Sequence, residues 1–201
     1  MKLSKKGECA LRSLINLGIA AEVGRSLVQV AELAASEQIP VKFLEQIMQA
    51  LRDGGLIVSM RGKFGGYRLA KPAGKITLGE VVRLIDGPLA PISCVSQTAY
   101  EKSSCPDEEH CGLRMLMLDV RNAIAGILDR STLADVVEVT LRKLRRDDMA
   151  LPFSPGAATA ASRSRVSVRN TNKLSGPNRA ARLSETEGVL HRLLRRLPQI
   201  I

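Results

Sequence analysis

The spacing of apolar residues changes at Gly54 and Gly55, and this change limits the possible folds more than any other feature of the chain. Before these glycines, apolar side chains recur every three or four residues, which is typical of amphipathic helices. After them, residues 56–58 and 67–69 read as two short strands around a basic, glycine-rich turn. Three short helices followed by such a hairpin form the outline of a winged helix-turn-helix.

The three helices are predicted over residues 8–21, 27–36 and 40–53. Pro40 fits the first turn of the third helix, where its missing N–H costs nothing. The two glycines after Asp53 can adopt left-handed conformations and end that helix. Its inward face is predicted to carry the apolar residues Leu44, Ile47, Met48 and Leu51.

The rest of the chain also reads mainly as helix, since aromatic residues make up 2% of it and its core must come from smaller aliphatic side chains. We therefore predict a mainly α fold, with a winged helix-turn-helix domain over residues 1–75 that contains a two-stranded wing. A connecting helix follows at 76–88 and opens with Thr77 as its N-cap. A cysteine-bearing sensor loop is predicted at 89–112, and two further helices at 113–149.

The first of these two helices has a long apolar face, made by Leu116, Met117, Val120, Ile124, Ile127 and Leu128. A stripe of that length is a liability in water unless another surface covers it. We interpret it as a dimerisation helix. The alternative is a helix packed wholly inside its own chain.

The second helix of a helix-turn-helix enters the major groove of DNA, so its outward residues meet bases and phosphates. Here these residues are predicted to be Val41, Lys42, Glu45, Gln46 and Gln49. Gln pairs with adenine, Glu accepts from cytosine, and Lys serves phosphate or guanine. From the wing, DNA contacts are predicted for Arg61, Lys63 and Arg68, with Gly65 and Gly66 allowing close approach of the backbone.

Charge is uneven along the chain, whose formal net charge is +10. Residues 150–201 carry nine basic and two acidic side chains and few large apolar ones, so this tail is predicted to be disordered. It could add phosphate contacts to DNA or be dispensable. The sequence has neither a signal peptide nor an apolar run long enough to cross a membrane, so we expect no membrane association and a cytoplasmic location.

Three of the four cysteines follow the pattern C-x10-C-x5-C in the sensor loop: Cys94, Cys105 and Cys111. Three thiols in one polar loop of a cytosolic protein suggest an iron–sulfur cluster or a soft metal ion. A disulfide switch and a zinc site are the rival interpretations, although zinc sites usually have paired cysteines at shorter spacing. The remaining cysteine, Cys9, lies on an apolar helix face and is predicted to be a core thiol.

Several segments together resemble the Rrf2 family of regulators, of the IscR, NsrR and RirA type. They are MKLSKKGECALRSL, FLEQIMQALRDGGLIVSMRGKFGGYRLAKP, ITLGEVVRLIDG, CPDEEHCGLR and TLADVV, and together they span roughly residues 1–145. Members of that family are homodimeric cytosolic regulators, mostly repressors, and several gain or lose DNA affinity with the state of a cluster. The resemblance implies that Glu45, Gln46 and Arg61 contact a palindromic operator.

The same resemblance implies that Cys94, Cys105 and Cys111 are ligands of a 2Fe-2S or 4Fe-4S cluster. IscR-like members have a histidine three residues after the last cysteine, where this chain has Arg114. In NsrR-like members an acidic residue from the partner subunit completes the set, and Glu8 stands at the corresponding place. We therefore expect the partner subunit's Glu8 to be the fourth ligand. A three-cysteine site completed by a small molecule, or by nothing, stays open.

An enzyme is not expected, because the sequence contains no nucleophile–base pair, phosphate-binding loop or paired carboxylate site. The sequence therefore predicts a DNA-binding regulator, in the first instance a repressor linked to a cluster. The alternative is a regulator of the same fold that is switched by thiol oxidation or by zinc.

Overall fold

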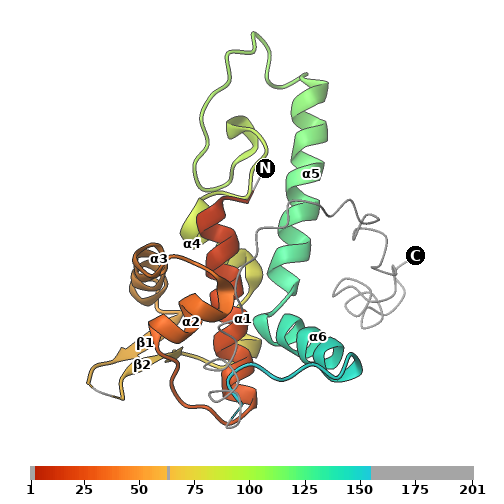
Figure 1. Ribbon diagram of the computed structural model, residues 1–201. Helices are drawn as coiled ribbons and strands as arrows, with labels where there is room; N and C mark the ends of the chain where they lie inside the picture. Colours follow the sequence, from red (N-terminus) through yellow and green to blue (C-terminus); the bar gives the residue numbers. More distant parts are fainter. Residues whose placement is uncertain (1–2, 63, 155–201) are drawn as a thin grey trace, which may run out of the picture.

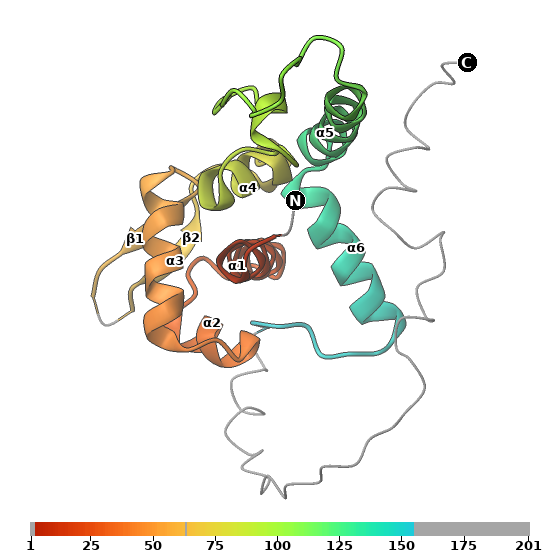
Figure 2. The same ribbon diagram turned by 90° about the horizontal axis from the view of Figure 1, so that it is seen from above.

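The computed structural model describes residues 3–62 and 64–154. Helix α1 (Lys5–Glu22) lies at the centre, and Figure 2, which looks along it, shows the other helices arranged around it. It begins at Ser4, whose hydroxyl accepts a hydrogen bond from the backbone N–H of Gly7. Its buried residues include Cys9, as predicted, and Leu14 at the centre of the core. The hydrophobic core therefore forms around α1.

Helices α2 (Val30–Glu37) and α3 (Val41–Asp53) form the helix-turn-helix. The turn between them depends on Gln38, which has a left-handed conformation with φ of 53°. On α3, the buried residues are the four predicted ones: Leu44, Ile47, Met48 and Leu51. The opposite face of α3 is thereby left for solvent or DNA.

The wing consists of β1 (Ile57–Met60) and β2 (Gly66–Leu69), paired antiparallel with Ile57 opposite Leu69. Tyr67 also exchanges two backbone hydrogen bonds with Val28, at 3.0 and 2.8 Å, which ties the wing to the segment before α2. The mainly α winged helix-turn-helix fold is thus confirmed.

Two further helices complete what we call the helical body, which comprises α1 to α4, the wing and α6. After the short turn η1 (Ala73–Lys75), helix α4 (Leu78–Asp86) starts at Thr77, whose hydroxyl accepts from the N–H of Glu80 at 3.1 Å. Helix α6 (Leu133–Arg146) starts at Thr132, which is joined to Thr77 by a β-bridge. α6 crosses α1 closely, because a Cβ at Gly18 would meet the side chain of Val137.

Residues 88–130 project from the helical body, and we call them the arm (Figure 1). The arm contains an irregular loop with the short turn η2 (Ser93–Val95), followed by the long helix α5 (Gly112–Arg130). Among the 19 residues of α5, Arg121 alone is buried. The alternative that α5 packs wholly inside its own chain is therefore wrong for the described residues.

The packed part of the chain continues past α6, since Leu151 and Phe153 lie against the core and Phe153 is 4% exposed. Both fall within the tail predicted to begin at residue 150. The predictions for Lys63 and for residues 155–201 lie outside the described residues. None of the helices in the described part is both long enough and apolar enough to cross a membrane.

Candidate DNA-binding surface and thiol pocket

The exposed residues of α3 include the five predicted to meet DNA: Val41, Lys42, Glu45, Gln46 and Gln49. Their exposure follows from the helical period, because the apolar residues between them are anchored in the core. Val41 is 42% exposed. An exposed apolar side chain there can contact the methyl group of a thymine.

Gln49 differs from the other four because neighbours on its own helix hold its amide. The amide donates to the carboxylate of Asp53 at 2.9 Å, and its oxygen accepts from Arg52 at 2.7 Å. Reading a base with Gln49 would require these hydrogen bonds to be exchanged. No hydrogen bond within the described residues holds the side chain of Gln46, and it is therefore the better candidate for base recognition.

In the wing, Arg61 and Arg68 are exposed. Gly65 and Gly66 stand at positions where the backbone leaves no room for a side chain. A Cβ on Gly65 would collide with the carbonyl of Met60, and one on Gly66 would lie 2.7 Å from the carbonyl of Val28. Gly65 therefore allows the tight turn of the wing, and Gly66 allows β2 to approach the segment before α2.

Phe64 was missed by the sequence reasoning. It is 83% exposed near the tip of the wing. A large apolar residue between the glycines of a basic turn was the available signal, because such a turn has no core to bury it. An exposed aromatic ring at this point can enter a DNA groove or pack against a sugar.

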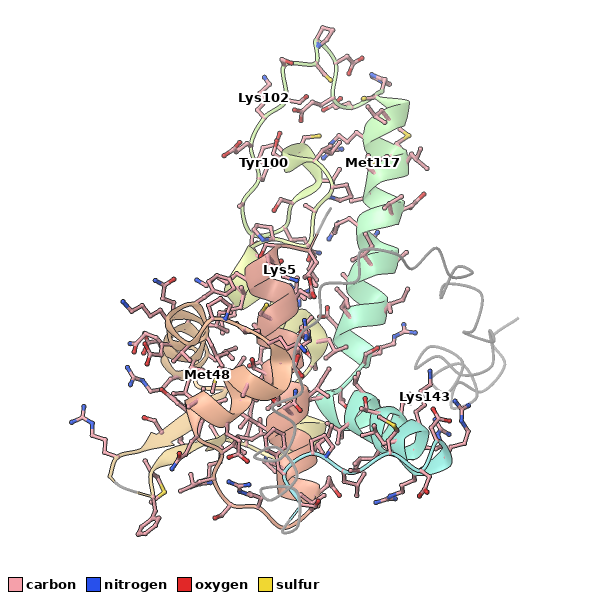
Figure 3. All side chains as sticks on the ribbon, in the orientation of Figure 1. Lys5, Met48, Tyr100, Lys102, Met117 and Lys143 are labelled. Carbon is pink, nitrogen blue, oxygen red and sulfur yellow. The ribbon has the colours of Figure 1, made fainter. Side chains whose placement is uncertain are left out.

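The three loop cysteines come together around one small pocket of about 170 Å³ in the arm. Cys94, from η2, is buried; Cys111 is half-buried just before α5; and Cys105 is exposed. All are free thiols. Figure 3 shows the loop that bears Tyr100 and Lys102 standing beside the part of α5 that carries Met117, away from Met48 in α3.

Two charged residues that the sequence reasoning did not assign to the site, Glu108 and Arg114, also line this pocket. Glu108 accepts from the Tyr100 hydroxyl at 2.7 Å and from the Ser103 N–H at 2.6 Å. The hydrogen bond from Tyr100 is the main reason why the pKa of Glu108 is lowered, and it also raises the pKa of Tyr100. Arg114 donates to the backbone carbonyl of Cys94 at 3.4 Å. These contacts hold the loop in a shape that gathers the thiols.

His110 and Glu8 do not line the thiol pocket of their own chain. His110 pairs with Asp107 at 2.7 Å on the exposed surface, and this pairing lowers the pKa of Asp107. Glu8, on α1, pairs with Lys5 and Arg12, and the hydrogen bond from Lys5 is the main cause of its lowered pKa. Within the described residues, no three His, Cys, Asp or Glu side chains stand in an arrangement ready to hold a metal ion.

The helix-turn-helix, the wing and the projecting long helix define a winged-helix transcription regulator that binds DNA. Comparison with known proteins gives the family. The model of the Rrf2 family, described as iron-dependent transcriptional regulators, matches residues 3–139, and the chain belongs to this family.

An rrf2-like HTH-type transcriptional regulator of Rhodobacter capsulatus is 36% identical over 139 residues, which cover 67% of this chain and 91% of the relative. The HTH-type transcriptional regulator IscR of Cronobacter sakazakii is 31% identical and covers 68% of this chain and 80% of its own length. The solved structure of CymR (YrzC), the global cysteine regulator of Bacillus subtilis, matches with a TM-score of 0.58 at 29% identity. This match covers 69% of this chain and 97% of CymR.

Proposed function

We propose that this protein is a homodimeric repressor whose affinity for a palindromic operator depends on an iron–sulfur cluster. In this proposal α3 and the wing bind DNA. Cys94, Cys105 and Cys111 hold the cluster, and Glu8 of the partner subunit completes the ligand set. The observation that carries the proposal is that Cys94, Cys105 and Cys111, three free cysteines of one irregular loop, line one pocket at the start of α5.

The donor set fits a cluster in its chemistry. Thiolates are the usual protein ligands of iron–sulfur clusters. Arg114 and the N-terminal end of α5 place positive potential beside the pocket, which favours the negative charge of thiolates and of a cluster. A bound cluster would supply a group that responds to oxidants, iron supply or nitric oxide. The loop hydrogen bonds from Tyr100 and Arg114 hold segments of the loop whose three thiols line this pocket.

A route from the pocket to the DNA-binding surface is available through α5. At its far end Asp129 forms a two-pronged ion pair with Arg83 of α4, at 2.6 and 2.8 Å. α4 in turn contacts α3, because a Cβ on Gly54 at the end of α3 would touch Leu84. A shift of α5 in a dimer would therefore change the separation of the two α3 helices, which is how a sensor can alter operator affinity.

The cluster is tested by anaerobic visible absorption, with iron and sulfide analysis, on the reconstituted full-length protein. Wild type is expected to be brown, and Cys105→Ala is expected to lose the cluster band. Cys9→Ala is the matched control, because Cys9 is a core thiol outside the pocket. Glu8→Ala is expected to shorten the lifetime of the cluster in air. An unchanged spectrum and lifetime in Glu8→Ala would exclude the fourth ligand while leaving the cluster in place.

DNA recognition is tested by selecting bound sequences from random duplexes and then measuring affinity by fluorescence anisotropy. Gln46→Ala is expected to cost about 1–3 kcal/mol and to relax the choice of base at one position of each half-site. Arg68→Ala is expected to weaken all sequences alike and to reduce the salt slope by about 1. Arg142→Ala is the control, since α6 lies on the opposite side of α1 from α3 (Figure 2). If all three variants bound alike, the proposed DNA surface would be wrong.

A thiol switch is the second candidate, and the exposure of Cys105 favours it. An exposed thiol can be oxidised and can form a disulfide with another cysteine of the same loop. Two results together would favour this switch over the cluster as the sensor. The protein would be colourless after anaerobic reconstitution, and mass spectrometry would find a Cys105 disulfide after mild oxidation. The proposed DNA surface is the same in both cases.

A further inference from the structure

Arg121 is the one buried residue of α5 in the described structure, and it is charged. It is 9% exposed, and its Nε atom is buried without a hydrogen-bond partner. This Nε–H donor is unsatisfied within residues 3–62 and 64–154. A buried N–H donor without a partner is costly, because nothing in the protein interior replaces the hydrogen bond to water that it loses.

The side chain lines a narrow pocket between three parts of the chain. Arg83 comes from α4, and Arg121 and Ala125 come from α5. The remaining wall is the first part of the sensor loop: Pro88, Leu89, Ala90, Ser96, Gln97 and Thr98. The free space is about 20 Å³, which suits a group of roughly the size of one water molecule. The wall also contains the hydroxyl groups of Ser96 and Thr98, which can donate hydrogen bonds.

The charge of this pocket is positive. None of the nine lining residues is acidic. Arg83 is already neutralised by Asp129, whose pKa is lowered mainly by the hydrogen bond from Arg83. The charge of Arg121 is therefore the uncompensated one. A planar guanidinium binds carboxylate and phosphate oxygens better than any other protein cation does.

We propose that this pocket binds a small oxyanion, a carboxylate or phosphate group, with Arg121 as its counter-ion and Ser96 and Thr98 as hydroxyl donors. One oxygen of the anion fills the pocket, and the rest of the ligand lies at the exposed residues Gln97 and Thr98. Since Cys94 is two residues before Ser96, a bound anion fixes the cysteine-bearing turn against α5. The site does not depend on a cluster being present.

A carboxylate from a second copy of the chain is the rival counter-ion. The geometry of α5 favours the small anion. Successive residues of a helix are turned by about 100°, so Arg121 faces a different direction from its exposed neighbour Val120. A second copy seated on the exposed apolar face would meet Val120, whereas Arg121 is covered by the loop of its own chain.

The test is the thermal unfolding midpoint of the full-length protein, titrated with acetate and separately with inorganic phosphate at constant ionic strength. The chain has no Trp, so circular dichroism is the suitable signal. In wild type at least one of the two anions is expected to raise the midpoint in a saturable way. An anion at 100 times its Kd raises the folded-to-unfolded ratio about 100-fold. Whether acetate or phosphate acts identifies the head group.

Three variants locate the effect. Arg121→Gln is expected to abolish the response, and Thr98→Val is expected to raise the Kd several-fold while leaving the fold intact. Arg130→Gln removes the same charge from an exposed position of the same helix and is expected to respond like wild type. Hydrogen exchange of residues 93–98 is expected to slow with anion in wild type and to be unaffected in Arg121→Gln.

Two results would overturn the proposal. An equal rise in wild type, Arg121→Gln and Arg130→Gln would show a general salt effect. No response of wild type to either anion, together with a weaker dimer of Arg121→Gln in sedimentation, would assign the counter-charge to the second copy. Neither result would bear on the DNA surface or on the cluster.

Discussion

The helical body and the arm differ in which side chains they bury and which they expose. In the body, α3 buries Leu44, Ile47, Met48 and Leu51 and exposes mainly polar residues. In the arm, α5 leaves Leu113, Met115, Leu116, Val120 and Ile127 exposed and buries an arginine. The body buries its apolar residues within a single chain, whereas in the described residues the apolar face of α5 is uncovered and the Nε atom of Arg121 has no hydrogen-bond partner. An uncovered apolar face and an unsatisfied buried donor indicate surfaces where other molecules bind.

The largest expected effect distinguishes the core of the body from its surface. Leu44→Ala removes a fully buried side chain of α3 and is expected to lower the free energy of unfolding by about 2–5 kcal/mol. Met149→Ala, at a position that is 60% exposed, is expected to change it by less than about 0.5 kcal/mol. Urea unfolding followed by circular dichroism measures both. A loss below about 1 kcal/mol in Leu44→Ala would mean that α3 is not anchored in the core as described.

The second prediction concerns the exposed face of the arm, which we propose is covered by a second copy. Leu116 is 56% exposed, and Leu116→Asp would place a charge in the proposed dimer interface twice. Burial of a leucine contributes about 1.5–3 kcal/mol, so the dimer should weaken about 100-fold or more. Sedimentation velocity over a range of concentrations measures this change.

Met149→Asp is the matched control for that experiment, because Met149 is similarly exposed but lies outside the arm. It should leave the dimer unchanged. If both variants were dimers of equal strength, α5 would not form the interface, and its apolar face would need a different partner. If wild type itself were monomeric, the homodimer would be excluded.

The contrast between body and arm also explains what the sequence could predict. The inner face of α3 was predicted residue by residue, because helix periodicity alone decides which side chains meet the core. The start of α1 at Lys5 was missed by three residues, since it depends on the cap at Ser4 and not on an apolar pattern. Local rules suffice for the inner face of α3, whereas α2, predicted from residue 27, begins at Val30 because Val28 pairs with Tyr67 of the wing.

The thiol pocket was predictable only in part. Cysteine spacing indicated a shared site, but the roles of Glu108 and Arg114 depend on loop hydrogen bonds to Tyr100 and to the carbonyl of Cys94. Such contacts join residues across an irregular loop, where periodicity carries no information. The packing of Phe153 on the core was missed for a similar reason, because its neighbours are set by the fold and not by the adjacent sequence.

The smallest expected effect concerns the ion pair that joins arm and body, between Asp129 and Arg83. Because the hydrogen bond from Arg83 lowers the pKa of Asp129, the carboxylate binds its proton more weakly in the folded state than in the unfolded state. Its contribution to stability is therefore fully present above the ordinary carboxyl pKa of about 3.9 and is lost as pH falls through the lowered pKa. Since Asp129 is 44% exposed, solvent screening limits the contribution to less than about 1 kcal/mol.

Asp129→Asn should lower the unfolding free energy by this small amount at pH 7, and the difference from wild type should shrink in acid. Asp119→Asn, an exposed position on the same helix, provides the control for the loss of one negative charge. Equal losses in the two variants at pH 7 would mean that the ion pair does not couple the arm to the body, and the proposed route from the thiol pocket to α3 would then need a different contact.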